Sequence, residues 1–174
     1  ITYRAVETLR SVDAIIAEDS RHSQKLLDHY DVDTPFTLSY YQGVGEDRRD
    51  KLIKKLLAGH DLALISDAGT PLISDPGFKL VRNVRERGLE VTGLPGPDAV
   101  ITSLSISGQP TDSFTFDGQA PKKEVKKRKY FEKLRSRIRT TVIYDSPHRI
   151  ETTMKLLVEV LPERSITVCR ELTK

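Results

Sequence analysis

The chain has 174 residues, of which 37% are hydrophobic and 30% are charged, and its formal net charge is +3 at pH 7. This composition is typical of a globular protein and excludes a fibrous or a mainly disordered chain. No apolar run approaches the length of about 20 residues that a membrane helix needs, and no signal peptide is visible, so we expect a cytoplasmic protein with no membrane partner. A single cysteine excludes an internal disulfide, and four scattered histidines give no zinc spacing, so we expect no metal.

Apolar runs of strand length alternate along the chain with segments of helical period. The expected helices cover residues 1–10, 20–30, 47–57, 76–87, 98–105, 122–139 and 149–161. The expected strands cover residues 14–17, 61–65, 90–94, 113–116, 140–144 and 165–170. Strands separated by helices predict an α/β fold with mostly parallel pairing. A turn-rich stretch at 107–112 predicts a seam between two lobes, which we place at residues 1–110 and 111–174.

Polar motifs follow several of the expected strands, where open α/β sheets bind their ligands. The first motif comes after the strand at 14–17 and combines Glu18, Asp19, Arg21 and His22, with Ser20 as the expected N-cap of the next helix. Two acids, an arginine and a histidine suit acid–base chemistry or substrate positioning. The alternative is a capped helix that carries surface charges.

Two loops rich in glycine and proline follow the next strands. Residues 66–77 contain two glycines, two prolines and two aspartates, so their backbone can approach a ligand closely. An ordered structural loop is the alternative, although ordinary connections need only about 2 to 6 residues. Residues 94–99 repeat the pattern on a smaller scale, because Gly96 permits close approach and Pro97 suits a first helical turn. Neither a complete G-x-G-x-x-G motif nor a P-loop occurs, which disfavours dinucleotide-binding and P-loop enzymes.

Two further segments carry dense charge. Residues 144–149 place a carboxylate, a hydroxyl, an imidazole and a guanidinium at one turn. Residues 122–139 hold ten basic residues and two acids, a local charge of +8. Such a concentration of positive charge is typical of contacts with nucleic-acid phosphates. The alternative is a solvated helix whose lysine and arginine stems cover a core, because Val125, Phe131, Leu134 and Ile138 have roughly helical spacing.

Five motifs taken in order resemble the ribosomal RNA small-subunit methyltransferase I family, which is similar to the tetrapyrrole methylases. They are A-E-D-S-R-H-S at 17–23, S-D-A-G-T-P-L-I-S-D-P-G at 66–77, L-P-G-P-D-A at 94–99, Y-D-S-P-H-R at 144–149 and C-R-E-L-T-K at 169–174. The resemblance implies a two-lobed fold with a mostly parallel sheet in the N-terminal lobe and a second, mixed α/β lobe. It also implies that the chain is the central part of its protein, because the family normally has a strand and loop before this segment and continues after it.

The resemblance further implies the chemistry and the residues that perform it. The expected activity is S-adenosylmethionine-dependent 2′-O-methylation of a cytidine ribose in small-subunit ribosomal RNA by a homodimer. The expected cofactor-binding residues are Asp67, Ala68, Gly69, Thr70, Pro71, Ile73, Ser74, Pro95, Gly96, Pro97, Asp98, Ala99, Tyr144 and Ser146. The sequence departs from the family at Asp98, where the family usually has serine.

The candidate bases or orienting groups are Glu18, Asp19, His22, His148 and Glu171. We expect the turns at 18–22 and 144–149 to face one cleft, because both follow strand ends, and to position the attacking hydroxyl there. The imidazole of His148 could accept the proton near neutral pH. The expected RNA contacts are Arg21, Lys122, Lys123, Lys126, Lys127, Arg128, Lys129, Arg149 and Arg170. Two other functions remain open: a methyltransferase acting on a tetrapyrrole or another small anionic substrate, and a non-catalytic RNA-binding module.

Overall fold

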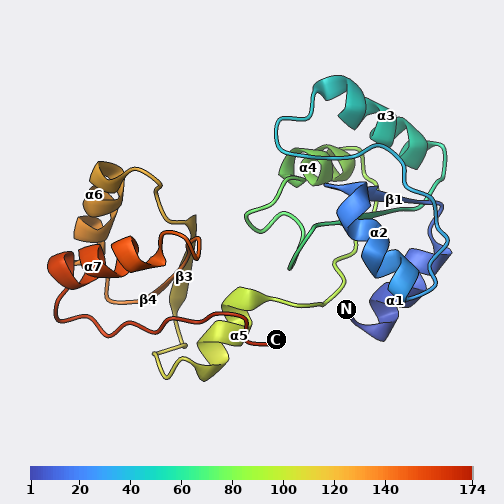
Figure 1. Cartoon of the computed structure of the whole chain (residues 1–174). Coiled ribbons are helices and arrows are strands. Elements are labelled where there is room, and N and C mark those ends of the chain that lie inside the picture. The colour runs from blue at the N-terminus through green and yellow to red at the C-terminus, as the bar shows by residue number, and fades with distance from the viewer. Residues whose placement is uncertain (174) are drawn as a thin grey trace. The chain divides into compact units, whose positions relative to one another are not determined.

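A computed structural model describes residues 1–173, and it divides the chain into two compact units, residues 1–98 and the part from Ala99 onward. The helices are α1 (Tyr3–Ser11), α2 (Ser20–His29), α3 (Glu46–Leu57), α4 (Phe78–Glu86), α5 (Ala99–Ile106), α6 (Glu124–Leu134) and α7 (Ile150–Val160). The strands are β1 (Ala14–Ala17), β2 (Leu62–Ile65), β3 (Phe114–Gln119) and β4 (Thr140–Tyr144) (Figure 1). The predicted α/β class is confirmed. The predicted seam at 107–112 follows α5, which belongs to the second unit, so the lobe boundary at residue 110 stays a prediction.

The first unit is built on β1, which pairs in parallel with β2 over its whole length. Residues 35–40, which no sequence pattern indicated as a strand, also pair with β1. The Ile15 N–H donates to the Pro35 carbonyl at 2.9 Å, and the Ile15 carbonyl accepts from the Thr37 N–H at 2.8 Å. β1 therefore has hydrogen-bonded neighbours on both sides.

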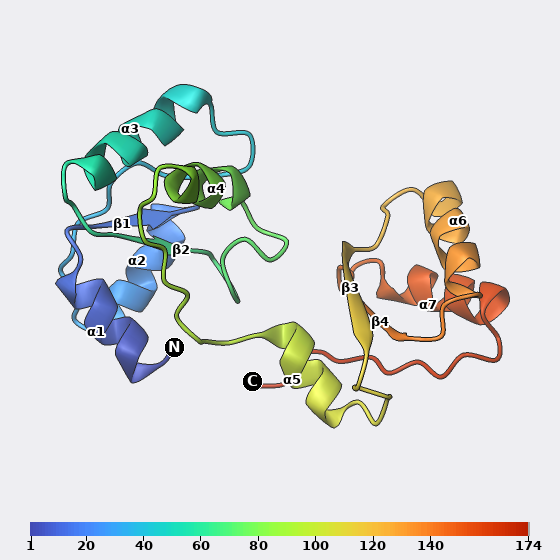
Figure 2. The same cartoon turned by 180° about the vertical axis from the view of Figure 1, so that it is seen from behind.

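Successive side chains of β1 enter two different cores, as the pleat of a strand requires. Ile16 packs with residues of α3 and α4, including Leu52 and Leu80. Ile15 faces the opposite way and packs with Leu9 of α1 and with residues of α2. Both views of the ribbon show α3 and α4 on one face of the sheet and α1 and α2 on the other (Figures 1 and 2). This three-layer arrangement leaves the carboxyl ends of β1 and β2 at one edge of the sheet.

The second unit has a parallel pair of strands, β3 and β4, with α6 and α7 packed together. Its core contains the fully buried Phe131 of α6 together with Leu156 and Leu157 of α7, and Ile143 of β4 lies against this cluster. Burying each such apolar side chain contributes about 1.5 to 3 kcal/mol. This core fixes the end of β4, and with it the turn at 144–149.

Several local predictions are wrong. Residues 90–94 and 165–170 alternate apolar and polar side chains, yet neither segment forms a strand in the part of the chain that the structure describes. A strand needs a hydrogen-bonded neighbour, and the apolar side chains of these segments stay partly uncovered, with Val168 55% exposed. The basic helix is also shorter than predicted, because it ends at Leu134, and Val125 and Ile138 of its expected apolar face are exposed.

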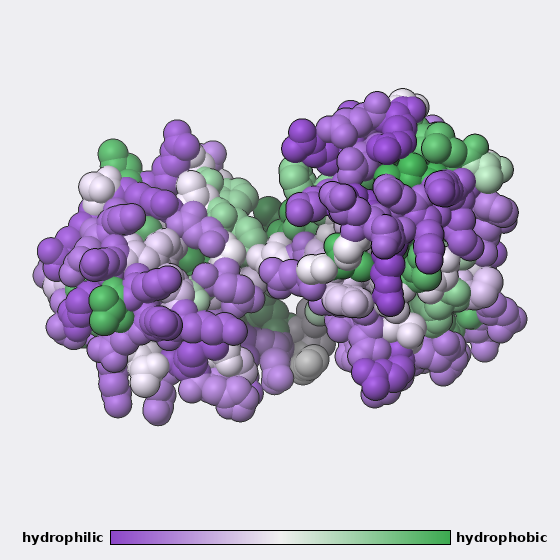
Figure 3. All heavy atoms as spheres, turned by 90° about the horizontal axis from the view of Figure 1, so that it is seen from above, coloured by the Kyte–Doolittle hydropathy of each residue, from purple (hydrophilic) through white to green (hydrophobic). Residues whose placement is uncertain are grey.

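The visible surface of both units is mostly hydrophilic when the molecule is seen from above (Figure 3). Exposed apolar side chains such as Tyr3 and Phe78 come from different elements. No described helix has the length and apolar character needed to span a membrane.

Candidate functional site

The loop at 66–77 leaves the carboxyl end of β2 with an unusual backbone. Four of its residues, Gly69, Leu72, Ser74 and Gly77, have positive φ angles between 68° and 136°. For Leu72 and Ser74 this conformation costs about 1 to 2 kcal/mol each. A Cβ atom on Gly77 would lie 2.9 Å from Leu72 Cδ1, and the φ of 136° is one that L side chains rarely adopt, so both features favour glycine there. This strain is consistent with a loop that is shaped for more than connection.

Gly69, in the same loop, has open surroundings instead. Its φ is +72°, but a Cβ atom placed there would meet no heavy atom within 4 Å. The space beside the Gly69 backbone is therefore open, and its use by a ligand stays a prediction.

Hydrogen bonds bring two of the predicted cofactor loops together within the first unit. The Thr70 hydroxyl donates to the Pro97 carbonyl at 3.4 Å. The Thr2 hydroxyl, at the N-terminus of α1, donates to the Pro95 carbonyl at the same distance. The loops at 66–77 and 94–99 are thus in contact within the first unit, whereas Ala99, Tyr144 and Ser146 lie in the second unit. The contacts of all these residues with a cofactor stay predictions.

Three carboxylates gather where β1 and β2 end. Burial raises the pKa of Glu18, and the nearby charges of Asp67 and Asp75 raise it further. Burial also raises the pKa of Asp75, although a hydrogen bond with Ser66 opposes this shift. Glu18 is one of the predicted acid–base residues, and its pKa is raised toward neutrality. A raised pKa makes its carboxylate a better proton acceptor at neutral pH.

The raised pKa of Glu18 gives a testable pH dependence of stability. Because the folded state favours the protonated form, the stability that Glu18 contributes is complete below its ordinary pKa of 4.5 and is lost as pH rises through its folded pKa. Glu18→Gln should consequently raise the free energy of unfolding at pH 7 more than at pH 4, as measured by urea denaturation. Glu7→Gln, an exposed change on α1, is the control. An equal gain for Glu18→Gln at both pH values would contradict this interpretation.

Asp19 has a structural position at the start of α2. Its carboxylate caps the helix by accepting from the Arg21 N–H at 2.9 Å, so Asp19 and not Ser20 is the N-cap. The Arg21 guanidinium donates to the same carboxylate at 2.9 and 3.2 Å. These bonds from Arg21 lower the pKa of Asp19 to about 2, which makes Asp19 a weak base. His22 is exposed beside it.

The turn at 144–149 is organised by Asp145, whose side chain is only 4% exposed. Its carboxylate accepts from Thr153 at 2.5 Å, from the Arg149 guanidinium at 2.6 and 3.0 Å, and from the Ser146 N–H at 2.7 Å. The Lys127 ammonium lies 3.4 Å away. Burial alone would raise the pKa of Asp145, but these hydrogen bonds and the Lys127 charge outweigh it, and the pKa is lowered.

The other residues of this turn are less constrained. His148 is exposed, and its N–H donates to the Ser146 hydroxyl at 3.3 Å. The Tyr144 ring packs edge-on against Phe116, with 4.8 Å between ring centroids. The turns at 144–149 and 18–22 belong to different units, so the cleft that we expect them to share stays a prediction.

Three of the predicted RNA contacts are engaged inside the second unit, and one of them is Arg149, which is bonded to Asp145. Lys127 is 4% exposed, and besides Asp145 it donates to the Thr153 hydroxyl at 2.5 Å, so it does not present its charge to solvent. Arg128 makes two hydrogen bonds with Glu159 at 2.8 and 2.9 Å. Arg21 is exposed but bonded to Asp19. The remaining candidates of this set are exposed: Lys122, Lys123, Lys126, Lys129 and Arg170. Glu171 is exposed as well, with a positive φ of 48°.

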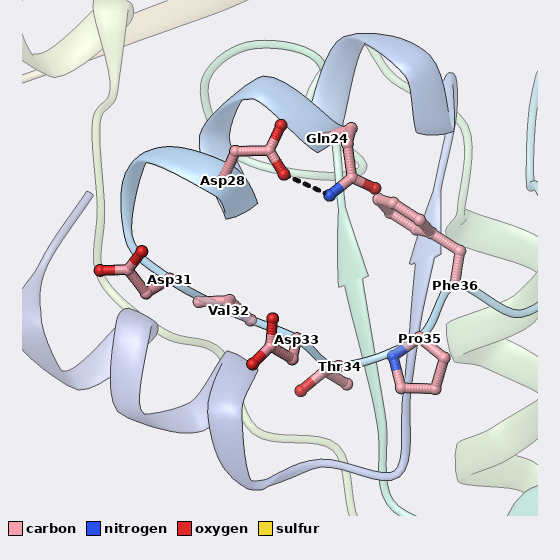
Figure 4. Close-up of a pocket in the computed structure, with 8 residues that line it drawn as sticks. All are labelled: Gln24, Asp28, Asp31, Val32, Asp33, Thr34, Pro35 and Phe36. Carbon is pink, nitrogen blue, oxygen red and sulfur yellow. Dashed lines mark hydrogen bonds between the residues drawn. The ribbon is translucent and has the colours of Figure 1, made fainter.

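A pocket of about 420 Å³ lies between α2 and the residues that follow it (Figure 4). Gln24 and Asp28 line it from α2, and the Gln24 amide donates to the Asp28 carboxylate at 2.7 Å. Residues 31–36 complete the lining. Although three aspartates line this pocket, no group of three or more His, Cys, Asp or Glu side chains within residues 1–173 could hold a metal ion.

Sequence reasoning missed two residues that complete these sites. Asp75 was part of the loop motif, but nothing in its spacing indicated that it lies near Glu18. Thr153, which is 1% exposed, joins Asp145 to Lys127. A signal for Lys127 was present, because it shares the face of α6 that carries Phe131 and Leu134, at i+4 and i+7.

Comparisons with known proteins agree with the motifs. A family model described as Tetrapyrrole (Corrin/Porphyrin) Methylases matches residues 1–174. A Vibrio cholerae protein named Ribosomal RNA small subunit methyltransferase I is 46% identical over 175 residues, which cover 100% of this chain and 60% of that protein. Proteins with the same name from Synechocystis and Bacillus subtilis are 46% and 42% identical over 100% of this chain.

The chain covers 62% of the Synechocystis protein and 59% of the Bacillus subtilis protein, so it spans about 60% of the length of these curated relatives. The names of the relatives confirm the resemblance that the five motifs indicate. The family match covers the whole chain, and with it both the open loop at 66–77 and the Asp145 turn. The chain therefore belongs to the tetrapyrrole (corrin/porphyrin) methylase family.

Proposed function

We propose that the protein transfers a methyl group from S-adenosylmethionine to the 2′-oxygen of a cytidine ribose in small-subunit ribosomal RNA. The observation that carries this proposal is the identity of 42 to 46% between the whole chain and proteins named Ribosomal RNA small subunit methyltransferase I. The exposed lysines at the start of α6 add support, because they suit a polyanionic substrate.

The residues of the first unit fit the proposed cofactor. The open space beside Gly69 and the exposed backbone at 95–97 could receive its adenosine part. The carboxylates of Glu18, Asp67 and Asp75 complement the positive charges of its sulfonium and ammonium groups. When bound, S-adenosylmethionine supplies a methyl group that is already electrophilic.

The chain's own residues would then align and deprotonate the attacking hydroxyl. Glu18 is the preferred proton acceptor, because its raised pKa makes its carboxylate more basic than an ordinary glutamate. His148 is the alternative, since it is exposed and its side chain is not held by the Asp145 network. Arg149 is held by Asp145 and would bring a positive charge to the same turn.

The other candidate functions have less support. A tetrapyrrole substrate fits the name of the family, but the relatives that match the whole chain are named for ribosomal RNA. A non-catalytic RNA-binding module would leave the strained loop at 66–77 and the carboxylates beside it unexplained. We also expect a homodimer and a cytoplasmic location, and both remain predictions.

The decisive experiment is mass spectrometry of small-subunit ribosomal RNA from cells that lack the protein. We expect one cytidine ribose to lose its methyl group and to regain it when the intact gene is restored. Purified protein, S-adenosylmethionine and the undermethylated RNA should restore the same methyl group in vitro. An unchanged set of ribose methyl groups in the deletion strain would overturn the proposed function.

A further inference from the structure

A groove of about 360 Å³ lies on the second unit where α6 and α7 pack together. Its lining includes Lys122 and Glu124 at the start of α6, and Arg149 and Thr152 at the start of α7. Lys155 follows one turn later on α7. We call this feature the α6–α7 groove. It belongs entirely to the second unit.

The charges around the α6–α7 groove are mostly positive, and two of them are unopposed. Lys122 and Lys155 are exposed, and neither makes an ion pair within residues 1–173. Lys127 and Arg149 also line the groove, but both lie against the Asp145 carboxylate. Of the two acids in the lining, Glu159 is held by Arg128 and Glu124 is exposed at the start of α6, so four basic side chains face two acidic ones. An anion entering the groove would therefore meet two free ammonium groups.

The ends of both helices reinforce this positive character. α6 and α7 each begin at the groove, and neither of their N-cap residues, Lys123 and Arg149, makes a side-chain capping bond. The first backbone N–H groups of a helix and the positive end of its dipole attract an anion. Each helix has 11 residues, long enough for this effect to develop.

We propose that the α6–α7 groove binds the phosphate backbone of the RNA substrate through Lys122 and Lys155. This inference rests on the proposed ribosomal RNA substrate and adds a site to it. None of the eight lining residues is aromatic, so the groove offers no surface on which a base could stack. Its contacts position the RNA and are independent of base sequence.

This assignment differs from the one that the charge pattern of residues 122–139 suggests. Lys127 and Arg128, in the middle of that run, are occupied by Asp145 and Glu159. Lys155 lies outside the run and faces the groove from α7. The phosphate contacts therefore involve two helices, and folding brings them together from distant parts of the sequence.

The salt dependence of RNA binding tests the groove. Small-subunit ribosomal RNA is titrated with the wild-type protein and with a Lys122→Gln/Lys155→Gln variant at several salt concentrations. If each lysine neutralises one phosphate, the slope of log affinity against log salt becomes shallower by about 1.4 to 1.8. A fourfold rise in salt then weakens binding by the variant about tenfold less than binding by the wild type.

A Lys51→Gln/Lys54→Gln variant removes the same charge from exposed positions outside the groove and should keep the wild-type slope. Equal binding of S-adenosylmethionine by all three proteins shows that the substitutions leave the first unit intact. If the wild type binds RNA and the groove variant keeps its slope, the groove assignment is overturned and the proposed function stands. If the wild type does not bind small-subunit RNA, the proposed function and the groove assignment both fail.

Discussion

Asp145→Ala is expected to lower the free energy of unfolding by about 3 to 5 kcal/mol, because it leaves a buried lysine without its counter-charge. The side chains of Lys127 and Asp145 are 5% and 4% exposed, so water cannot replace the lost carboxylate. Thr153 and Arg149 lose a hydrogen-bond acceptor at the same time. Urea denaturation of the wild type and the variant measures the difference.

An exposed pair in the same unit supplies the control. Glu159→Ala removes the partner of Arg128, whose side chain is 37% exposed, and should cost no more than about 1 kcal/mol. A Lys127→Met/Asp145→Ala double variant should recover part of the stability, since it removes both buried charges. A cost for Asp145→Ala no larger than that for Glu159→Ala would show that the pair is not a buried ion pair in solution.

Gly69→Val is expected to abolish the binding of S-adenosylmethionine, which isothermal titration calorimetry of the purified protein would measure. The valine methyl groups would project into the open space beside the loop, where no atom of the folded chain lies within 4 Å of the new Cβ. A β-branched residue at a φ of +72° would also strain the loop, at a cost of about 1 to 2 kcal/mol or more.

Gly88→Val is a matched control for this strain. Gly88 has a φ of +74° and equally open surroundings, but it follows α4 and lies outside both cofactor loops. Its variant should unfold at a temperature similar to that of Gly69→Val and still bind S-adenosylmethionine. Full cofactor affinity in a well-folded Gly69→Val protein would remove the loop at 66–77 from the proposed site.

The elements predicted correctly are those with a strong local signal. β1 was predicted with its observed bounds, Ala14–Ala17, because an uninterrupted apolar run between polar residues is typical of a strand buried on both faces. Residues 90–94 and 165–170 alternate apolar and polar side chains, which also favours a strand, but they form no strand in the described structure. Side-chain pattern shows which residues could form a strand, whereas pairing depends on a neighbour that is distant in the sequence. For the same reason, the sequence pattern does not indicate the pairing of residues 35–40 with β1.

The candidate site was predictable in its motifs and less so in its contacts. The glycine-rich loop at 66–77 was located from composition, since positive φ angles favour glycine. The ion pair between Lys127 and Asp145 joins residues 18 positions apart. The density of basic residues at 122–139 instead suggests that Lys127 faces solvent. Only the packing of α6 against α7 turns that lysine inward, and a count of basic residues contains no information about such packing.

The placement of β1 between β2 and residues 35–40 has a consequence for the dynamics of the first unit. All four residues of β1 are buried, and helices cover both faces of the strand. Amide protons in such a strand exchange with solvent only when the surrounding structure opens as a whole. The Ile15 amide, bonded to the Pro35 carbonyl, should therefore be among the slowest to exchange with deuterium, whereas the unpaired backbone at 90–94 should exchange through local openings.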